Sequence, residues 1–205
     1  MGDRLDIHPV TPQARLIQQA ARSVNAGGLL VIPTDAGYSL VWGLDAVDAE
    51  NRVQRLRQLD SKHPFTVLCA TISQIGSLAK LDNDAFRIVK SHTPGPITFI
   101  LPAGAELPRR LKQSKRRAIG CRIPDNAVAQ ALLEAAGSPL LATSLVLPDE
   151  AFDSHDAYEV EQRLLRHVDF MLDAGDCPPG PTSVLDLTGE APQVTRQGFQ
   201  ELHLD

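Results

Sequence analysis

Short apolar runs alternate with helical patterns along most of the chain. Residues 29–32 form a buried-strand pattern that stops at Pro33, whose ring removes a backbone donor. Before it, apolar residues at helical spacing predict a helix with Thr11 as N-cap, Pro12 at its first position and Gly27 at its end. Later strands are predicted at 38–43, 65–70, 97–101, 118–123, 140–144, 169–173, 182–187 and 193–196.

Helical segments separate several of these strands. Asp48, Asn83 and either Asp125 or Asn126 are suited to cap three of them, and residues 71–78 and 157–167 are predicted as two more. Strands outnumber the helices between them, which favours a mixed sheet. With 205 residues, no repeat and no linker, we expect one α/β (α+β) domain over residues 1–205.

Several predicted strands end in a hydroxyl or a guanidinium group. The residues concerned are Thr34, Thr98, Arg122, Ser144, Thr182 with Ser183, and Arg196. Hydroxyls can hold anionic oxygens, and the arginine fork matches a carboxylate or a phosphate. Because ligands of open α/β sheets bind beyond the strand ends, the pattern predicts a site for a phosphorylated or carboxylated small molecule. Taken singly, each residue also fits a polar position at the wet end of a strand.

Charge is unevenly distributed along the chain. The formal net charge is -5, yet seven of the 20 basic residues fall in 109–122, where no acid occurs. They are Arg109, Arg110, Lys112, Lys115, Arg116, Arg117 and Arg122. Such a segment on an acidic body predicts a local patch that binds RNA phosphates, and the alternative is a solvated loop.

Other classes of site and location have little support in the sequence. The three cysteines form no C-x-x-C pair and the six histidines show no ligand spacing, so no metal site is predicted. No phosphate-binding P-loop motif occurs. No apolar run is long enough to span a membrane, and the N-terminus lacks signal-peptide order, so we expect a cytoplasmic protein without membrane contact. Among the histidines, only His63 precedes a strand close to the predicted site.

Six ordered segments together resemble one known family. They read P-T-D-A-G-Y (33–38), T-P-G-P-I-T (93–98), G-C-R-I-P (120–124), A-T-S (142–144), P-T-S-V (181–184) and R-Q-G (196–198). This series is similar to that of the YrdC-like family, the threonylcarbamoyl-adenylate synthases, and within it to the YciO-like branch. The resemblance spans about residues 12–198. Six motifs in order with compatible spacing are far more specific than any one of them.

The resemblance implies a fold and a reaction. The fold is a twisted mixed sheet around a deep, positively lined cleft, first described in the family as a surface for double-stranded RNA. The reaction joins L-threonine, bicarbonate and ATP, with Mg²⁺, into threonylcarbamoyl-AMP and pyrophosphate for the t6A modification of tRNA. The alternative is a protein that binds double-stranded RNA or tRNA without synthase activity.

The family's site residues map onto numbered positions of this chain. Thr34, Arg122, Thr182 and Ser183 resemble positions that hold threonine, with Tyr38 as a wall of that pocket. Arg57, Ser144 and Arg196 resemble nucleotide-binding positions, and Arg57 and Ser144 also resemble catalytic ones. No tightly bound metal is implied.

Two positions of the family's Lys-Arg-Ser-Asn signature differ in this chain. Aligned without gaps, the Lys is Arg57 and the Arg is Leu59, whereas a shifted alignment would use Arg55 and Arg57. The Ser is Ser144, and the Asn position holds Val146. Loss of an arginine that stabilises transition-state charge can cost about 3 kcal/mol, so the pattern predicts weakened or altered activity.

Overall fold

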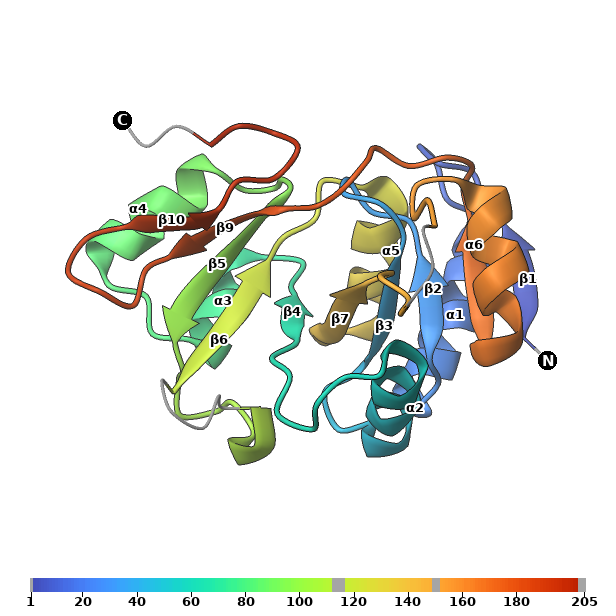
Figure 1. Ribbon diagram of the computed structural model, residues 1–205, viewed down its shortest axis with the longest axis horizontal. Coiled ribbons are helices and arrows are strands. Elements are labelled where there is room, and N and C mark those ends of the chain that lie inside the picture. The colour runs from blue at the N-terminus through green and yellow to red at the C-terminus, as the bar shows by residue number, and fades with distance from the viewer. Residues whose placement is uncertain (1, 112–116, 149–151, 203–205) are drawn as a thin grey trace.

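The computed structural model describes residues 2–111, 117–148 and 152–202. The strands form one continuous sheet, and helices lie on both of its faces (Figure 1). The helices are α1 (Ala14–Asn25), α2 (Val47–Arg57), α3 (Ile72–Leu78), α4 (Asn83–Ser91), α5 (Ala127–Ala136) and α6 (Ala157–Leu164), with 3₁₀ turns η1 (Arg109–Leu111) and η2 (Leu165–His167). The strands are β1 (Asp3–Asp6), β2 (Leu30–Ile32), β3 (Ser39–Gly43), β4 (Thr66–Leu68), β5 (Ile97–Pro102), β6 (Ala118–Arg122), β7 (Leu140–Ser144), β8 (Phe170–Asp173), β9 (Ser183–Asp186) and β10 (Gln193–Arg196).

The strands pair in the order β1-β8-β2-β3-β7-β4-β6-β5-β9-β10. The β1–β8, β2–β8, β4–β6 and β5–β9 pairs are parallel and the other five are antiparallel. The predicted single-domain α/β fold with a mixed sheet is therefore confirmed. Strands from the two ends of the sequence are adjacent, because β8 lies between β1 and β2.

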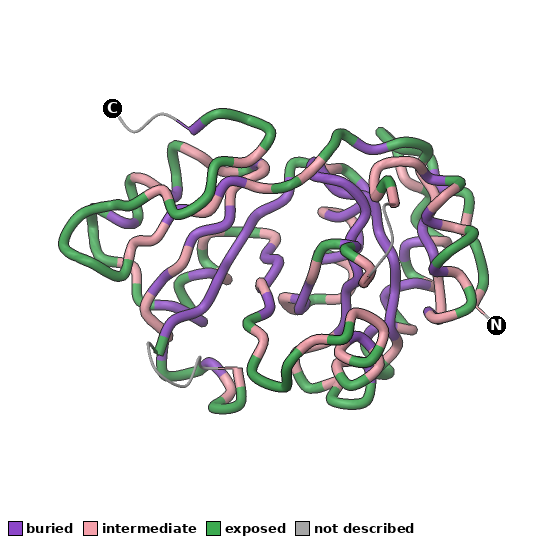
Figure 2. The backbone as a smooth tube through the Cα atoms, viewed as in Figure 1, coloured by how far each residue is buried: buried purple, intermediate pink, exposed green. Residues whose placement is uncertain are grey.

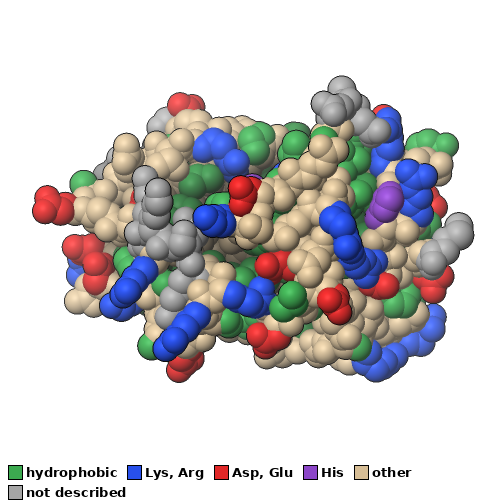
Figure 3. Space-filling model, turned by 60° about the horizontal axis from the view of Figure 1, so that its bottom comes forward, with side chains coloured by type: hydrophobic (Ala, Val, Ile, Leu, Met, Phe, Trp, Pro, Cys, Tyr) green, Lys and Arg blue, Asp and Glu red, His purple; other side chains and the backbone are tan. Residues whose placement is uncertain are grey.

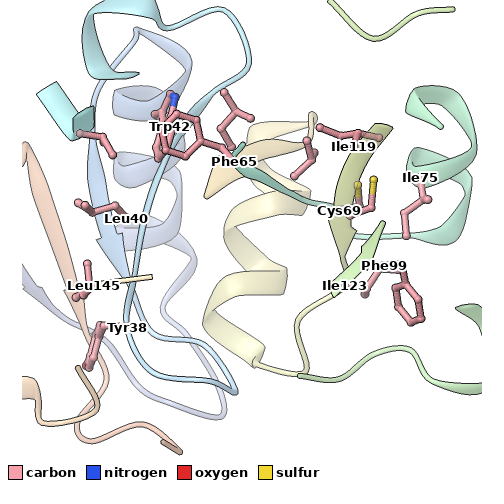
Figure 4. Close-up of a cluster of buried hydrophobic side chains, with 14 of the residues drawn as sticks. Tyr38, Leu40, Trp42, Phe65, Cys69, Ile75, Phe99, Ile119, Ile123 and Leu145 are labelled. Atoms are coloured by element: carbon pink, nitrogen blue, oxygen red, sulfur yellow. The ribbon is translucent and has the colours of Figure 1, made fainter. Parts of the chain in front are cut away.

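Two clusters of apolar side chains hold the layers together. In β2, Leu30 and Ile32 face the cluster under α1 and α5, while Val31 faces the cluster under α2 and α6. This alternation follows from the two-residue period of a strand, and the whole strand is buried (Figure 2). The larger cluster extends from Tyr38 and Leu40 on one side to β5 on the other (Figure 4).

Helix starts agree with the sequence only in part. Asn126 caps α5 by accepting hydrogen bonds from two backbone N–H groups, as one of the two predicted alternatives required. Asp82 rather than Asn83 caps α4, and α2 begins without a side-chain cap. The predicted Thr11 cap is wrong: α1 begins at Ala14, because Thr11 instead bonds the ring Nδ1 of His8 in a separate turn.

The first strand was not predicted. β1 is short, has no alternation of apolar and polar residues and is mostly exposed. It forms because its backbone pairs with β8 over four residues, and because Arg4 makes ion pairs with Asp6, Glu161 and Asp173. Such pairing depends on a partner more than 160 residues away in the sequence, so no local pattern predicts it.

Candidate functional site

A cavity of about 690 Å³ lies where the two halves of the sheet meet, and residues of β3, β4, β5, β6, β7, β9 and β10 and of the neighbouring loops line it. On β4, β5 and β6, alternate residues face the cavity: Thr66, Leu68, Thr98, Ile100, Gly120 and Arg122. The residues between them, such as Val67, Phe99 and Cys121, are buried in the core. Its volume lies within the range of about 300–1,000 Å³ that is usual for small-molecule sites.

Arg57 enters this cavity from the last turn of α2. Its Nε donates to the carbonyl of Val146 at 3.0 Å, and its Nη1 donates to Oγ1 of Thr143. Burial lowers the pKa of Arg57, although an arginine stays protonated in proteins. Of the three positions that the two alignments use, Arg57 lines the cavity and Arg55 and Leu59 do not.

Arg122 lies at the end of β6 and is buried together with Asp35. Its Nη2 donates to Asp35 Oδ1, and its Nε donates to the carbonyl of Gly95 at 3.4 Å. Burial lowers the pKa of Arg122, whereas the charge of Asp35 acts in the opposite direction. The pair is neutral as a unit, and Asp35 Oδ2 has no hydrogen-bond partner among the described residues.

Arg196 approaches the cavity from β10, on the opposite side to Arg57. Its Nε donates to the carbonyl of Thr182 at 2.9 Å and its Nη2 donates to Oγ1 of the same residue, also at 2.9 Å. That hydroxyl lies 3.2 Å from Oγ1 of Thr98. Ser144, the register partner of Ser39 on β3, adds another hydroxyl to the lining.

The structure thus brings together five of the seven strand-end residues that the sequence singled out: Thr98, Arg122, Ser144, Thr182 and Arg196. Three guanidinium groups and several hydroxyls face one cavity, and its described lining contains no Asp or Glu. Within the described ranges, neither Arg57 nor Arg196 has a carboxylate within ion-pair distance. The cavity therefore carries a net positive charge suited to an anion.

Two predicted threonine-binding residues lie behind the cavity wall. Thr34 is fully buried: its Oγ1 donates to the carbonyl of Gly37 at 2.6 Å and accepts from the N–H of Ala36. Ser183 Oγ donates to the carbonyl of Gln200 and accepts from the N–H of Gly198. Both hydroxyls shape loops, so in this structure neither is part of the cavity lining.

Tyr38 is likewise no wall of the cavity. Its ring is fully buried in the core, and its hydroxyl donates to the carbonyl of Gly175 at 2.7 Å. Burial is the main reason why the pKa of Tyr38 lies well above its usual value. Tyr38 therefore anchors the loop after β8 to the loop between β2 and β3.

Sequence reasoning missed part of the lining. Thr143 holds Arg57 in place, and Leu147, Phe152 and Ser154 come from the segment between β7 and α6, for which the sequence predicted no site residue. Thr143 stood inside the A-T-S motif, but nothing local showed that it would receive a hydrogen bond from a helix 86 residues earlier. The apolar residues lay outside every quoted motif.

The structure describes only part of the basic segment. Arg109 and Arg110 lie exposed on η1, Arg110 makes an ion pair of 2.7 Å with Glu50, and Arg117 is exposed before β6. Lys112, Lys115 and Arg116 lie outside the described residues. On the face shown in Figure 3, the described Lys and Arg side chains are interspersed with Asp and Glu.

The described residues provide neither a cluster of metal ligands nor a helix that could span a membrane. Within the described residues, no group of three His, Cys, Asp or Glu side chains could hold a metal ion. The three cysteines are buried and unpaired by disulfides, consistent with core positions. None of the helices formed by the described residues is long and apolar enough to cross a membrane.

Comparison with known proteins identifies relatives of this chain. A family model named Sua5_yciO_yrdC and described as "Telomere recombination" matches residues 22–198. YciO of Escherichia coli strain K12 is 47% identical over 196 residues, which cover 96% of this chain and 95% of that protein. The crystal structure of E. coli YciO matches with a TM-score of 0.92 and 45% identity over 98% of both chains.

More distant relatives carry a named activity. The threonylcarbamoyl-AMP synthase of Pyrococcus abyssi is 28% identical over 187 residues, which cover 89% of this chain and 54% of that enzyme. The crystal structure of P. abyssi Sua5 complexed with L-threonine has a TM-score of 0.85 at 24% identity, which shows a shared fold. This chain spans about half the length of that relative. Given a family match over most of its length and a full-length relative at 47% identity, the chain belongs to the Sua5, YciO and YrdC family.

Proposed function

We propose that this protein is a threonylcarbamoyl-AMP synthase-type enzyme that binds a nucleotide and threonine and is related to t6A modification of tRNA, with an activity altered by its changed signature residues. One observation carries the proposal. Arg57 and Arg196 face the same cavity from opposite sides, and no carboxylate of the described residues neutralises them. Arg57 is partly buried and Arg196 is exposed, and two cations that face one cavity without a paired carboxylate suit an anionic ligand.

The proposed substrates are ATP, L-threonine and bicarbonate. The amine of threonine condenses with bicarbonate to an N-carboxylate with loss of water. An oxygen of that N-carboxylate then attacks the α-phosphorus of ATP, and the bond to pyrophosphate breaks. Negative charge then moves onto the departing oxygen, where Arg57 or Arg196 can stabilise it without reorganising. Hydroxyls of Thr98, Ser144 and Thr182 can orient the carboxylate and phosphate oxygens.

Mg²⁺ would accompany ATP in this reaction. Because the described lining contains no carboxylate, the residues fit an ion held by the phosphates and water rather than by a protein cage. The relatives support the assignment of substrates: the P. abyssi relative is named a threonylcarbamoyl-AMP synthase, and P. abyssi Sua5 forms a complex with L-threonine.

The direct test is the formation of threonylcarbamoyl-AMP and pyrophosphate from ATP, threonine and bicarbonate. We expect Arg57→Ala to lower the rate roughly a hundredfold, because it removes a preorganised cation from the cavity. Arg55→Ala is the matched control: it lies two residues earlier on the same helix, is exposed and does not line the cavity. Equal rates for both variants, or no product from the unmodified protein at high concentration, would reject the proposal.

A second candidate function is binding of double-stranded RNA or tRNA. The exposed Arg109 and Arg117, which flank the rest of the basic segment, favour it. Phosphate contacts release counterions, so binding should weaken steeply between about 50 and 200 mM salt. Arg109→Ala combined with Arg117→Ala should weaken it further. An affinity that does not depend on salt concentration, or no binding to duplex RNA and tRNA, would exclude this candidate function.

A further inference from the structure

His63 is the one group in the described cavity lining whose charge can change near neutral pH. The arginines remain protonated, and the hydroxyls of serine and threonine remain neutral. An unperturbed histidine titrates near pH 6.5. His63 lines the cavity from the loop between α2 and β4, two residues before Phe65.

The surrounding contacts orient the His63 side chain without engaging the two nitrogens of its ring. Its backbone N–H donates to the carbonyl of Asp60 at 2.9 Å, which closes a turn after α2. Its ring lies 5.3 Å from the ring of Phe65, centroid to centroid, at an angle of 60°. Phe65 is in turn packed edge-on against Trp42. Neither ring nitrogen of His63 has a hydrogen-bond partner within residues 2–111, 117–148 and 152–202.

Arg57 disfavours a second cation at His63 while the cavity holds no ligand. Arg57, from α2, lowers the pKa of His63, although desolvation by burial is the larger cause. β4 and β7 contribute only uncharged side chains to the described lining. The other charged groups are Asp60 and Lys62 on the same loop, and Arg122 and Arg196 across the cavity.

We propose that His63 is a proton-dependent phosphate-binding residue: its imidazole is neutral in the free protein and gains a proton when a polyphosphate occupies the cavity. The proposal rests on the proposed function and specifies how that site holds the phosphates of its nucleotide. A bound phosphate offsets the charge of Arg57 and offers an acceptor to the imidazolium, and both effects favour the charged form of His63.

This role fits the changed signature of the chain. Leu59 stands in place of a signature arginine and does not line the cavity, and Val146 presents an apolar, exposed side chain in place of an asparagine. A histidine supplies a replacement cation only in the presence of the ligand, so the free protein is spared another unpaired charge. Binding of phosphates and uptake of one proton are then thermodynamically linked.

Calorimetry with pyrophosphate tests the linkage. Binding is measured near pH 7 in two buffers of different ionisation enthalpy, which counts the protons exchanged. Pyrophosphate itself exchanges protons, so the measured quantity is the difference between the unmodified protein and H63Q. We expect the unmodified protein to take up more protons, by as much as about one per ligand, and to bind roughly tenfold more tightly than H63Q at pH 6 but not at pH 8.

H167Q is the matched control. The pKa of His167 is also lowered by burial and by neighbouring arginines, but His167 does not line the cavity, so its replacement should leave proton uptake unchanged. NMR of the unmodified protein gives a readout without any mutation: the His63 resonances alone should shift to a higher titration midpoint with pyrophosphate.

The outcomes separate the two proposals. Pyrophosphate binding with identical proton counts for the unmodified protein and H63Q, and with no shift of the His63 midpoint, would overturn this inference and leave the proposed function standing. Failure of both pyrophosphate and ATP to bind would overturn both.

Discussion

Asp35 and Arg122 form the most buried ion pair among the described residues, with side-chain exposures of 10% and 6%. Burying two charges is costly, and the pair repays this cost only while both partners remain. Its place beside the cavity suggests why the chain keeps it: Asp35 fixes the direction of a guanidinium whose other side faces the ligand space.

Asp35→Ala should destabilise the protein by about 3 kcal/mol, because it leaves the positive charge of Arg122 buried without compensation. Urea unfolding measures this loss. Asp84→Ala breaks an exposed i,i+3 pair with Arg87 and should change the free energy of unfolding little. If both variants unfolded at the same urea concentration, Asp35 would not be compensating a buried charge.

At the scale of elements, the loop between β2 and β3 determines the shape of the cavity wall. Gly37 has a φ of 78°, and its N–H donates to the carbonyl of Pro178 at 2.7 Å. The next N–H, that of Tyr38, donates to the carbonyl of Ser154 at 2.8 Å. This loop therefore joins two segments from the last third of the chain, and Ser154 reaches the lining through that contact.

Comparison of Gly37→Ala with Gly137→Ala separates the cost of a positive φ from the cost of a steric contact. Both glycines have a positive φ, which costs a residue with a Cβ about 1–2 kcal/mol. At Gly37 an added Cβ would also lie 3.0 Å from Oγ of Ser154, whereas at Gly137 it would meet nothing within 4 Å. Thermal unfolding should therefore show a larger loss for Gly37→Ala, and equal losses would mean that the Ser154 segment yields freely.

At the scale of the whole molecule, the cavity connects the two halves of the sheet. Arg57 and Thr143 belong to the half containing β3 and β7, and Arg196 and Thr182 belong to the half containing β9 and β10. A ligand held by both arginines would bridge elements that are distant in sequence and separated by three strands in the sheet. Its binding energy would then stabilise both halves.

Hydrogen exchange can detect such bridging. With ATP and threonine present, we expect slower amide exchange both at the end of α2 with β7 and in β9 with β10, because local opening must first release the ligand. β1 lies at the far edge of the sheet, does not line the cavity, and should be unaffected. Protection confined to one half would show that only one arginine holds the ligand.

Much of the fold was readable from local pattern, and the exceptions have physical causes. The apolar run of β2 and the cap at Asn126 depend on neighbours within a few residues, so the sequence predicted the strand and narrowed the cap to Asp125 or Asn126. β1 and the start of α1 depend instead on pairing with β8 and on a side chain of His8. Competing contacts of this kind leave no periodic signal.

The sequence by itself determined the family, the order of most strands and helices, and the chemical types of group that follow those strands. These properties are local, because strand alternation, helix caps and motif spacing are set within short windows. Only the tertiary structure decided which of those groups share a cavity. Thr34 and Ser183 turn inward to bond loop backbones, while Arg57 and His63 reach the lining from outside the strand ends. The direction of a side chain depends on long-range packing, and no short window contains that information.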